Sequence, residues 1–169
     1  MDELFVPDWR LHASRCHGKP GRTNGPDTHR PFLPNIHGRK TMYTGQYILE
    51  RVKQLGVETV FGLPGDFNFG LLDLIEDDSA LEWAGNANEL GAAYATDGYA
   101  RLSGFGMLVT TWGVGELSAL NGVAGAFVER TPMVHVVGSP PQRMQKAHLP
   151  IHHSFGDGEF GMYLSLIHI

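Results

Sequence analysis

The chain has 169 residues, of which 42% are hydrophobic, and its formal net charge at pH 7 is −5. This length allows one domain with a hydrophobic core, and the acidic balance argues against binding to nucleic acid or to an anionic membrane surface. Because Cys16 is the only cysteine, no internal disulfide can form, and we expect a cytoplasmic protein. The sequence has no run of about 18 apolar residues that would predict a membrane-spanning helix, and its first residues lack the pattern of a signal peptide.

The first forty residues differ in composition from the rest of the chain. They carry seven Lys or Arg and four Asp or Glu, a net charge of +3, whereas residues 41–169 carry six and fourteen, a net charge of −8. Few apolar positions recur periodically in residues 1–40, and the four histidines there lack metal-ligand spacing. We therefore expect a disordered or non-homologous extension. An organelle transit peptide is the alternative, but four acids and a single serine argue against it.

From residue 41 onward, apolar segments alternate between helical and strand patterns. Thr44 is the candidate cap of the first helix, and Gly56 ends it. In chain order the pattern predicts a helix over residues 44–55, a strand over 57–61, a helix over 67–75, a strand over 81–84, a helix that carries Glu89, a strand over 107–112, a helix over 116–128 and a strand over 133–138.

This alternation indicates an α/β fold with an open, doubly wound, mostly parallel sheet and helices on both of its faces. In such sheets ligands bind beyond the carboxyl ends of the strands. The turns that follow the strands are therefore the candidate site, and they span residues 62–68, 85–89, 113–116 and 138–142.

Two of these turns carry the candidate carboxylates Asp66 and Glu89. Asp66 follows the tight turn at Pro64 and Gly65 and is left at the carboxyl end of a strand, although an aspartate there could equally cap the next helix. Glu89 lies in the first turn of a helix rich in small residues, such as Ala92 and Ala93, which leave room for a large group to pack nearby. A carboxylate in that setting suits proton exchange, but an acid in a first turn also stabilises the helix dipole without any further function.

Two further segments carry groups that could take part in a site. Residues 110–122 combine a strand end, a glycine turn and a helix start, which is a general anion site; the spacing is not that of a dinucleotide fingerprint. His152 and His153 are adjacent on a loop, and histidine is suited to proton transfer near neutral pH. Taken alone, two neighbouring surface histidines need have no function.

Together these segments resemble the thiamine-diphosphate-dependent 2-keto-acid decarboxylases, the pyruvate decarboxylase family. The resemblance covers about residues 43–160. It rests on Asn-Glu-Leu at 88–90, Gly-Asp-Phe-Asn at 65–68, Thr-Thr-x-Gly-Val-Gly-Glu-Leu-Ser-Ala from 110, and the histidine pair. Trp112 stands where the family usually has Phe or Tyr.

The resemblance implies a thiamine diphosphate pyrimidine-binding domain over residues 41–160, followed by an atypical tail at 161–169. The family's glutamate hydrogen-bonds the aminopyrimidine ring and relays a proton, so Glu89 would hold this role. Gly65 and Thr111 would contact the cofactor with it. Three residues would exchange protons with substrate and intermediates, namely Asp66, His152 and His153.

Thiamine diphosphate and Mg²⁺ are the implied cofactors, and the Mg²⁺ site belongs to a domain that this sequence does not include. Gly-Asp-Gly at 156–158 resembles the start of the metal motif, but no asparagine pair completes it, so Asp157 is interpreted as a loop residue and no metal ligand is expected here. The implied partners are a small 2-keto acid and further copies of the subunit.

The implied reaction converts pyruvate to acetaldehyde and carbon dioxide, with this chain inactive alone. An aromatic 2-keto acid such as indolepyruvate is the alternative substrate. A different class of function is a catalytically dead binding module that associates with full-length subunits.

Overall fold

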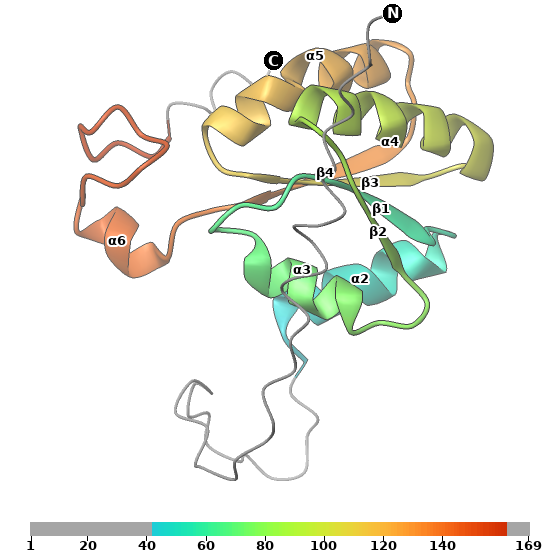
Figure 1. Ribbon diagram of the computed structural model, residues 1–169, viewed down its shortest axis with the longest axis horizontal. Helices are drawn as coiled ribbons and strands as arrows, with labels where there is room; N and C mark the ends of the chain where they lie inside the picture. The colour runs from blue at the N-terminus through green and yellow to red at the C-terminus, as the bar shows by residue number, and fades with distance from the viewer. Residues whose placement is uncertain (1–41, 162–169) are drawn as a thin grey trace, which may run out of the picture. The chain divides into compact units, whose positions relative to one another are not determined.

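A sheet of four parallel strands forms the centre of the computed structural model, which describes residues 42–161 (Figure 1). The strand order is β2-β1-β3-β4. The strands are β1 (Thr59–Gly62), β2 (Glu82–Gly85), β3 (Gly106–Thr111) and β4 (Met133–Gly138). The predicted open, parallel α/β sheet is therefore confirmed. The extension expected at residues 1–40 and the tail from residue 162 lie outside the described residues.

Helices cover both faces of this sheet, as the alternation predicts. Helices α2 (Thr44–Gln54) and α3 (Phe69–Glu76) lie on one face, and α4 (Glu89–Ser103) and α5 (Val114–Val128) lie on the other (Figure 1). A short helix, α6 (Gln142–Lys146), follows β4 and was not predicted, because it is polar and buries no residue. Among the described residues, no helix combines the length and the apolar character that a membrane crossing requires.

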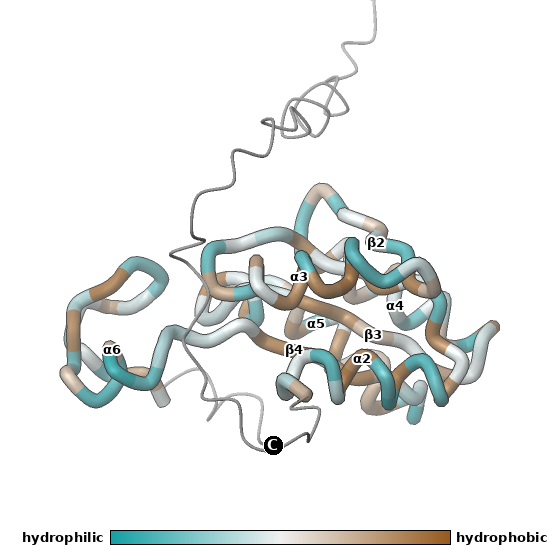
Figure 2. The backbone as a smooth tube through the Cα atoms, turned by 90° about the horizontal axis from the view of Figure 1, so that it is seen from below, coloured by the Kyte–Doolittle hydropathy of each residue, from teal (hydrophilic) through white to brown (hydrophobic). Residues whose placement is uncertain are grey.

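Strand β3 lies between two hydrophobic layers and is buried at all six positions, as expected for a parallel strand covered on both faces. Figure 2 shows the hydrophobic stretches mostly in the interior of the fold. One layer gathers large side chains from α2, α3 and the strands, namely Leu49, Val52, Val57, Val60, Leu72, Ile75, Met107 and Val109. The other is built from small residues of α4 and α5 together with Leu108.

Helices α4 and α5 approach each other closely because small side chains line their contact. A Cβ atom added to Gly122 would lie 2.5 Å from the Cβ of Ala93, and both Ala92 and Ala93 are fully buried. The room that the sequence predicted beside α4 is thus occupied by α5. This tight pairing fixes the N-terminus of α4, which carries Glu89, against the N-terminal half of α5.

The helix ends follow local side-chain and glycine signals. Helix α2 begins at Thr44 itself, so the expectation that Thr44 precedes and caps the helix is wrong; the Gln46 side chain instead accepts a hydrogen bond from the Tyr43 N–H at 3.0 Å. Gly56 follows the last turn with a φ of 87°, a conformation that favours glycine. Gly104 ends α4 in the same region, with a φ of 92°.

The strand order has a topological switch point between β1 and β3. The strands all run parallel, but the chain adds β2 on one side of β1 and β3 on the other. Ligands of doubly wound folds bind at this switch point, outside the carboxyl ends of the strands. The turn after β1 and the turn between β3 and α5 are consequently the structural candidates for a site.

Close packing between β1 and β3 makes Gly62 sensitive to substitution. A Cβ at Gly62 would lie 2.0 Å from the Val109 carbonyl oxygen and 2.7 Å from Cη2 of Trp83. We expect Gly62→Ala to lower the free energy of unfolding by about 1–3 kcal/mol, as overpacking does. Urea unfolding of the whole chain measures this change.

Gly98→Ala is the matched control, since a Cβ at this exposed helical position meets nothing within 4 Å. It should raise stability by roughly 0.5–1 kcal/mol. Equal stability of the two alanine variants would contradict the packing described for the strands.

Candidate active site

The side chain of Thr111 joins two of the turns at the carboxyl edge of the sheet. A Cβ added to Gly65 would lie 2.6 Å from the Cβ of Thr111, and one added to Gly115 would lie 2.8 Å from its Cγ2. Thr111 is 5% exposed, and its Oγ1 has no hydrogen-bond partner. Because buried hydroxyls normally find a partner, this unpaired oxygen marks the junction of the two turns as a candidate site.

The Glu89 carboxylate also lies close to Gly115. Oε1 of Glu89 would be 3.2 Å from a Cβ added to Gly115, and the residue is half-buried. The side-chain cap of α4 is Asn88, whose Oδ1 accepts a hydrogen bond from the Gly91 N–H at 2.7 Å. Capping of α4 therefore does not require the Glu89 carboxylate, which sits against the glycine at the start of α5.

The turn after β1 is held by a buried asparagine. Asn68 is 2% exposed; its Oδ1 accepts from the Gly65 N–H at 2.9 Å, and its Nδ2 donates to the Leu63 carbonyl at 3.0 Å. Asn68 also stands at the N-cap position of α3. Asp66 consequently does not cap that helix, and its carboxylate is left exposed at the edge of the sheet.

The structure brings His152 to Asp66. Nε2 of His152 lies 3.2 Å from Oδ2 of Asp66, an ion pair when the imidazole is protonated. The rings of His152 and His153 are 4.7 Å apart and nearly perpendicular. His153 has a φ of 65°, and its buried Nδ1 has no hydrogen-bond partner. Asp66 and the two histidines thus form one group, which adjoins Glu89 through Gly65, Thr111 and Gly115.

Sequence reasoning missed Glu116, a buried carboxylate in the first turn of α5. Glu116 is 1% exposed, and its Oε1 accepts a hydrogen bond from the Gly113 N–H at 3.0 Å. Its Oε2 has no partner, and burial raises the pKa of the carboxyl above its ordinary value. The Gly-x-x-Glu spacing of a capping box was the available signal. The Glu116 carboxylate therefore already accepts a hydrogen bond from one backbone amide, that of Gly113, in the turn that the sequence pattern suggested as an anion site.

Aromatic rings also lie close to one another near Asp66 and the two histidines. Phe67 lies edge-on to Trp112, with ring centroids 6.3 Å apart, and Trp112 lies 5.4 Å from Phe160. Trp112 and Phe160 also line a pocket of about 270 Å³, whose other lining residues are Glu116, Val137, Ser139, Pro140 and Gln145. Trp112, which stands where the resembled family usually has Phe or Tyr, is 3% exposed, so its larger ring is buried.

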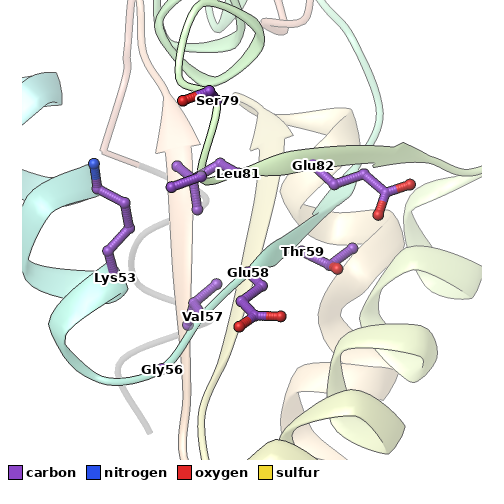
Figure 3. Close-up of a pocket in the computed structure, with 9 residues that line it drawn as sticks. Lys53, Gly56, Val57, Glu58, Thr59, Ser79, Leu81 and Glu82 are labelled. Carbon is purple, nitrogen blue, oxygen red and sulfur yellow. The ribbon is translucent and has the colours of Figure 1, made fainter.

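Other polar groups lie apart from this edge. A pocket of about 580 Å³ opens at the amino ends of β1 and β2, where Lys53, Glu58 and Glu82 point in different directions (Figure 3). Asp157 accepts a hydrogen bond from the Glu159 N–H within its own loop. Within residues 42–161, no three His, Cys, Asp or Glu side chains come together as a metal site would require.

Replacing Glu116 with glutamine should change how stability depends on pH. The pKa of Glu116 is raised in the folded chain above the ordinary 4.5, so just above pH 4.5 the folded state keeps a proton that the unfolded state loses. The free energy of unfolding then falls as pH rises from 4.5 through the folded-state pKa. The side chain of Glu116→Gln can still accept a hydrogen bond from the Gly113 N–H but does not titrate. The variant should therefore not lose this part of the free energy of unfolding as pH rises.

Urea unfolding between pH 4.5 and 8 measures the effect. The glutamine variant should gain stability relative to the natural chain as pH rises, whereas Glu116→Ala should cost about 1 kcal/mol through the lost cap. Parallel pH curves for the natural chain and Glu116→Gln would contradict the burial of an unpaired carboxylate oxygen.

Comparisons with known proteins identify the family of the chain. Residues 42–159 match the family described as thiamine pyrophosphate enzyme, N-terminal TPP binding domain. The chain is 57% identical over 119 residues to pyruvate decarboxylase isozyme 3 of Saccharomyces cerevisiae, covering 70% of this chain and 21% of the relative. It is 54% identical over 119 residues to the pyruvate decarboxylase of Hanseniaspora uvarum, with the same coverage. An alpha-keto-acid decarboxylase of Mycobacterium leprae is 50% identical over 128 residues, covering 75% and 22%.

The chain spans about a fifth of the length of these curated relatives. The matched residues include all four strands and both turns that meet at Thr111. The resemblance seen in the sequence is confirmed, and the chain belongs to the pyruvate decarboxylase family of thiamine pyrophosphate enzymes, within which residues 42–159 correspond to the N-terminal cofactor-binding domain.

Proposed function

We propose that this chain provides the pyrimidine-binding side of the active site of a thiamine-diphosphate-dependent 2-keto-acid decarboxylase, which converts pyruvate to acetaldehyde and carbon dioxide. The observation that carries the proposal is the position of the Glu89 carboxylate beside Gly115, next to the unpaired hydroxyl of Thr111. The family match and the names of the relatives support the same activity.

The residues at the switch point fit the flat aminopyrimidine ring of the cofactor. Gly65 and Gly115 lack side chains that would collide with Thr111, and a Cβ on Gly115 would also crowd Oε1 of Glu89. Thr111 Oγ1 offers a buried hydrogen-bonding atom without a partner. Glu89 would hold a ring nitrogen, and Gly65 and Thr111 would form the wall of the site.

When bound, the cofactor would supply a carbon nucleophile and an electron sink for decarboxylation. Glu89 would hold and release a proton at its carboxylate. Asp66 and His152, 3.2 Å apart, exchange a proton with each other and with the substrate. His153 presents a second ring to the same group. Histidine suits this work because its ordinary pKa is near 6.5.

The remaining parts of the site would come from domains outside this sequence. The diphosphate and its Mg²⁺ are held by such a domain, and the complete site forms between subunits of a homo-oligomer. The single chain would be inactive alone, because the binding of the diphosphate and its metal ion contributes much of the cofactor affinity. The lack of cysteine pairs supports a cytoplasmic location.

A second candidate is a non-catalytic module that binds full-length subunits. It is favoured by large apolar side chains left exposed on α4 and α5, which need cover by another polypeptide; they are Tyr94, Leu102, Val114, Phe127 and Val128. Co-purification with a full-length decarboxylase supports this role, and failure to co-purify contradicts it.

The decarboxylase proposal is tested by grafting residues 42–160 into the 57% identical yeast relative in place of its matching segment. The chimera should release acetaldehyde from pyruvate faster than it decarboxylates indolepyruvate, and the reverse preference would favour the aromatic substrate. Glu89→Gln in the chimera should lower kcat by roughly 100-fold or more, the loss typical of a proton-transfer group, while the melting temperature stays the same.

Glu82→Gln is the matched control. Glu82 is an exposed carboxylate of β2 on the edge pocket remote from Thr111, and its neutralisation should leave kcat unchanged. Full activity of the Glu89→Gln chimera would overturn the role assigned to Glu89.

A further inference from the structure

The ring of Phe67 contacts both histidines of the site. It stacks on His152, with ring centroids 4.9 Å apart and an interplanar angle of 15°. It lies edge-on to His153, with centroids 6.2 Å apart and an angle of 81°. Because Phe67 follows Asp66 directly in the chain, one short segment supplies both the acid that pairs with His152 and the surface on which its imidazole rests.

The backbone of Phe67 is held from two sides, which fixes where the ring starts. The neighbouring Asn68 is buried and bonds across the turn to Gly65 and Leu63. At the end of β4, a Cβ added to Gly138 would lie 2.4 Å from the Phe67 carbonyl oxygen. Phe67 thus lies between the turn after β1 and the end of β4, and its ring is nearly perpendicular to that of the buried Trp112.

His152 has no comparable restraint of its own. Its side chain is 53% exposed, and that of its partner Asp66 is 65% exposed. An exposed ion pair is screened by water and does little to hold two side chains in one geometry. The titratable groups that face His152 are Asp66 and His153. The stacked ring of Phe67 is the contact that limits rotation of the imidazole, since stacked aromatic pairs have a preferred geometry.

We propose that Phe67 is a positioning residue that holds the imidazole of His152 in line with Asp66, so that a proton can pass between Nε2 of His152 and Oδ2 of Asp66. The catalytic consequence rests on the proposed function, whereas the orientation is a property of this chain. No role in proton transfer is assigned to Phe67 itself, which has no ionisable group.

The orientation is tested by NMR on the whole chain. The Phe67 ring current should shift the carbon-bound ring protons of His152 upfield, with cross-relaxation between the two rings. Phe67→Leu should remove both signals, and Phe67→Tyr, which keeps the ring, should restore them. Phe69→Leu is the matched control, because Phe69 is 48% exposed two residues further on and should leave the His152 signals unchanged. Unchanged His152 signals in folded Phe67→Leu would overturn the proposal.

The consequence is tested in the chimera described above. Phe67→Leu should lower kcat by roughly ten- to 100-fold, as a displaced catalytic group does, without changing the thiamine diphosphate concentration that gives half activity. Phe67→Tyr should recover kcat. A kcat for Phe67→Leu equal to that of Phe69→Leu would overturn the positioning role. Activity retained by Glu89→Gln would contradict the proposed function separately, because the NMR result does not depend on turnover.

Discussion

The packing of Thr111 between Gly65 and Gly115 is the constraint on which the rest of the site depends. Neither glycine could carry a Cβ without approaching Thr111 to within 2.8 Å, so the turn after β1 and the start of α5 are locked to the end of β3. Glu89 reaches the same place because α4 lies tightly on α5 through Ala93 and Gly122. Backbone packing among small residues, rather than polar contacts, thus determines where the carboxylate lies.

The sequence was sufficient to predict the layers of the fold but only part of the site. Apolar runs and glycine turns define the strands and helices, because each burial pattern has its own period. The start of α5 was placed two residues late, since Gly113 and Gly115 look like a longer turn. Glu116 was missed because an acid in a first helical turn is usually exposed. The contact of His152 with Asp66 and Phe67 joins segments 85 residues apart, and no local pattern encodes it.

The two edges of the sheet have different characters. At the carboxyl edge, Asp66, His152 and His153 form a connected group of ionisable side chains, and the ring of Phe67 contacts both histidines. At the amino edge, Lys53 is already paired with Glu50 and Asp78, and the pocket there gathers no comparable group. Among the described residues, the ionisable side chains of the predicted site therefore gather at the carboxyl ends of the strands.

The most direct test of this account is an NMR titration of the isotopically labelled chain with thiamine, which carries the pyrimidine ring but needs no metal. We expect weak binding, with a Kd in the millimolar range, and amide shifts concentrated at Gly65, Glu89, Thr111 and Gly115. Shifts concentrated instead at the amino-edge pocket, around Glu58 and Glu82, would contradict the assignment of the pyrimidine site to the carboxyl edge of the sheet. An absence of shifts at the four amides named above would contradict it as well.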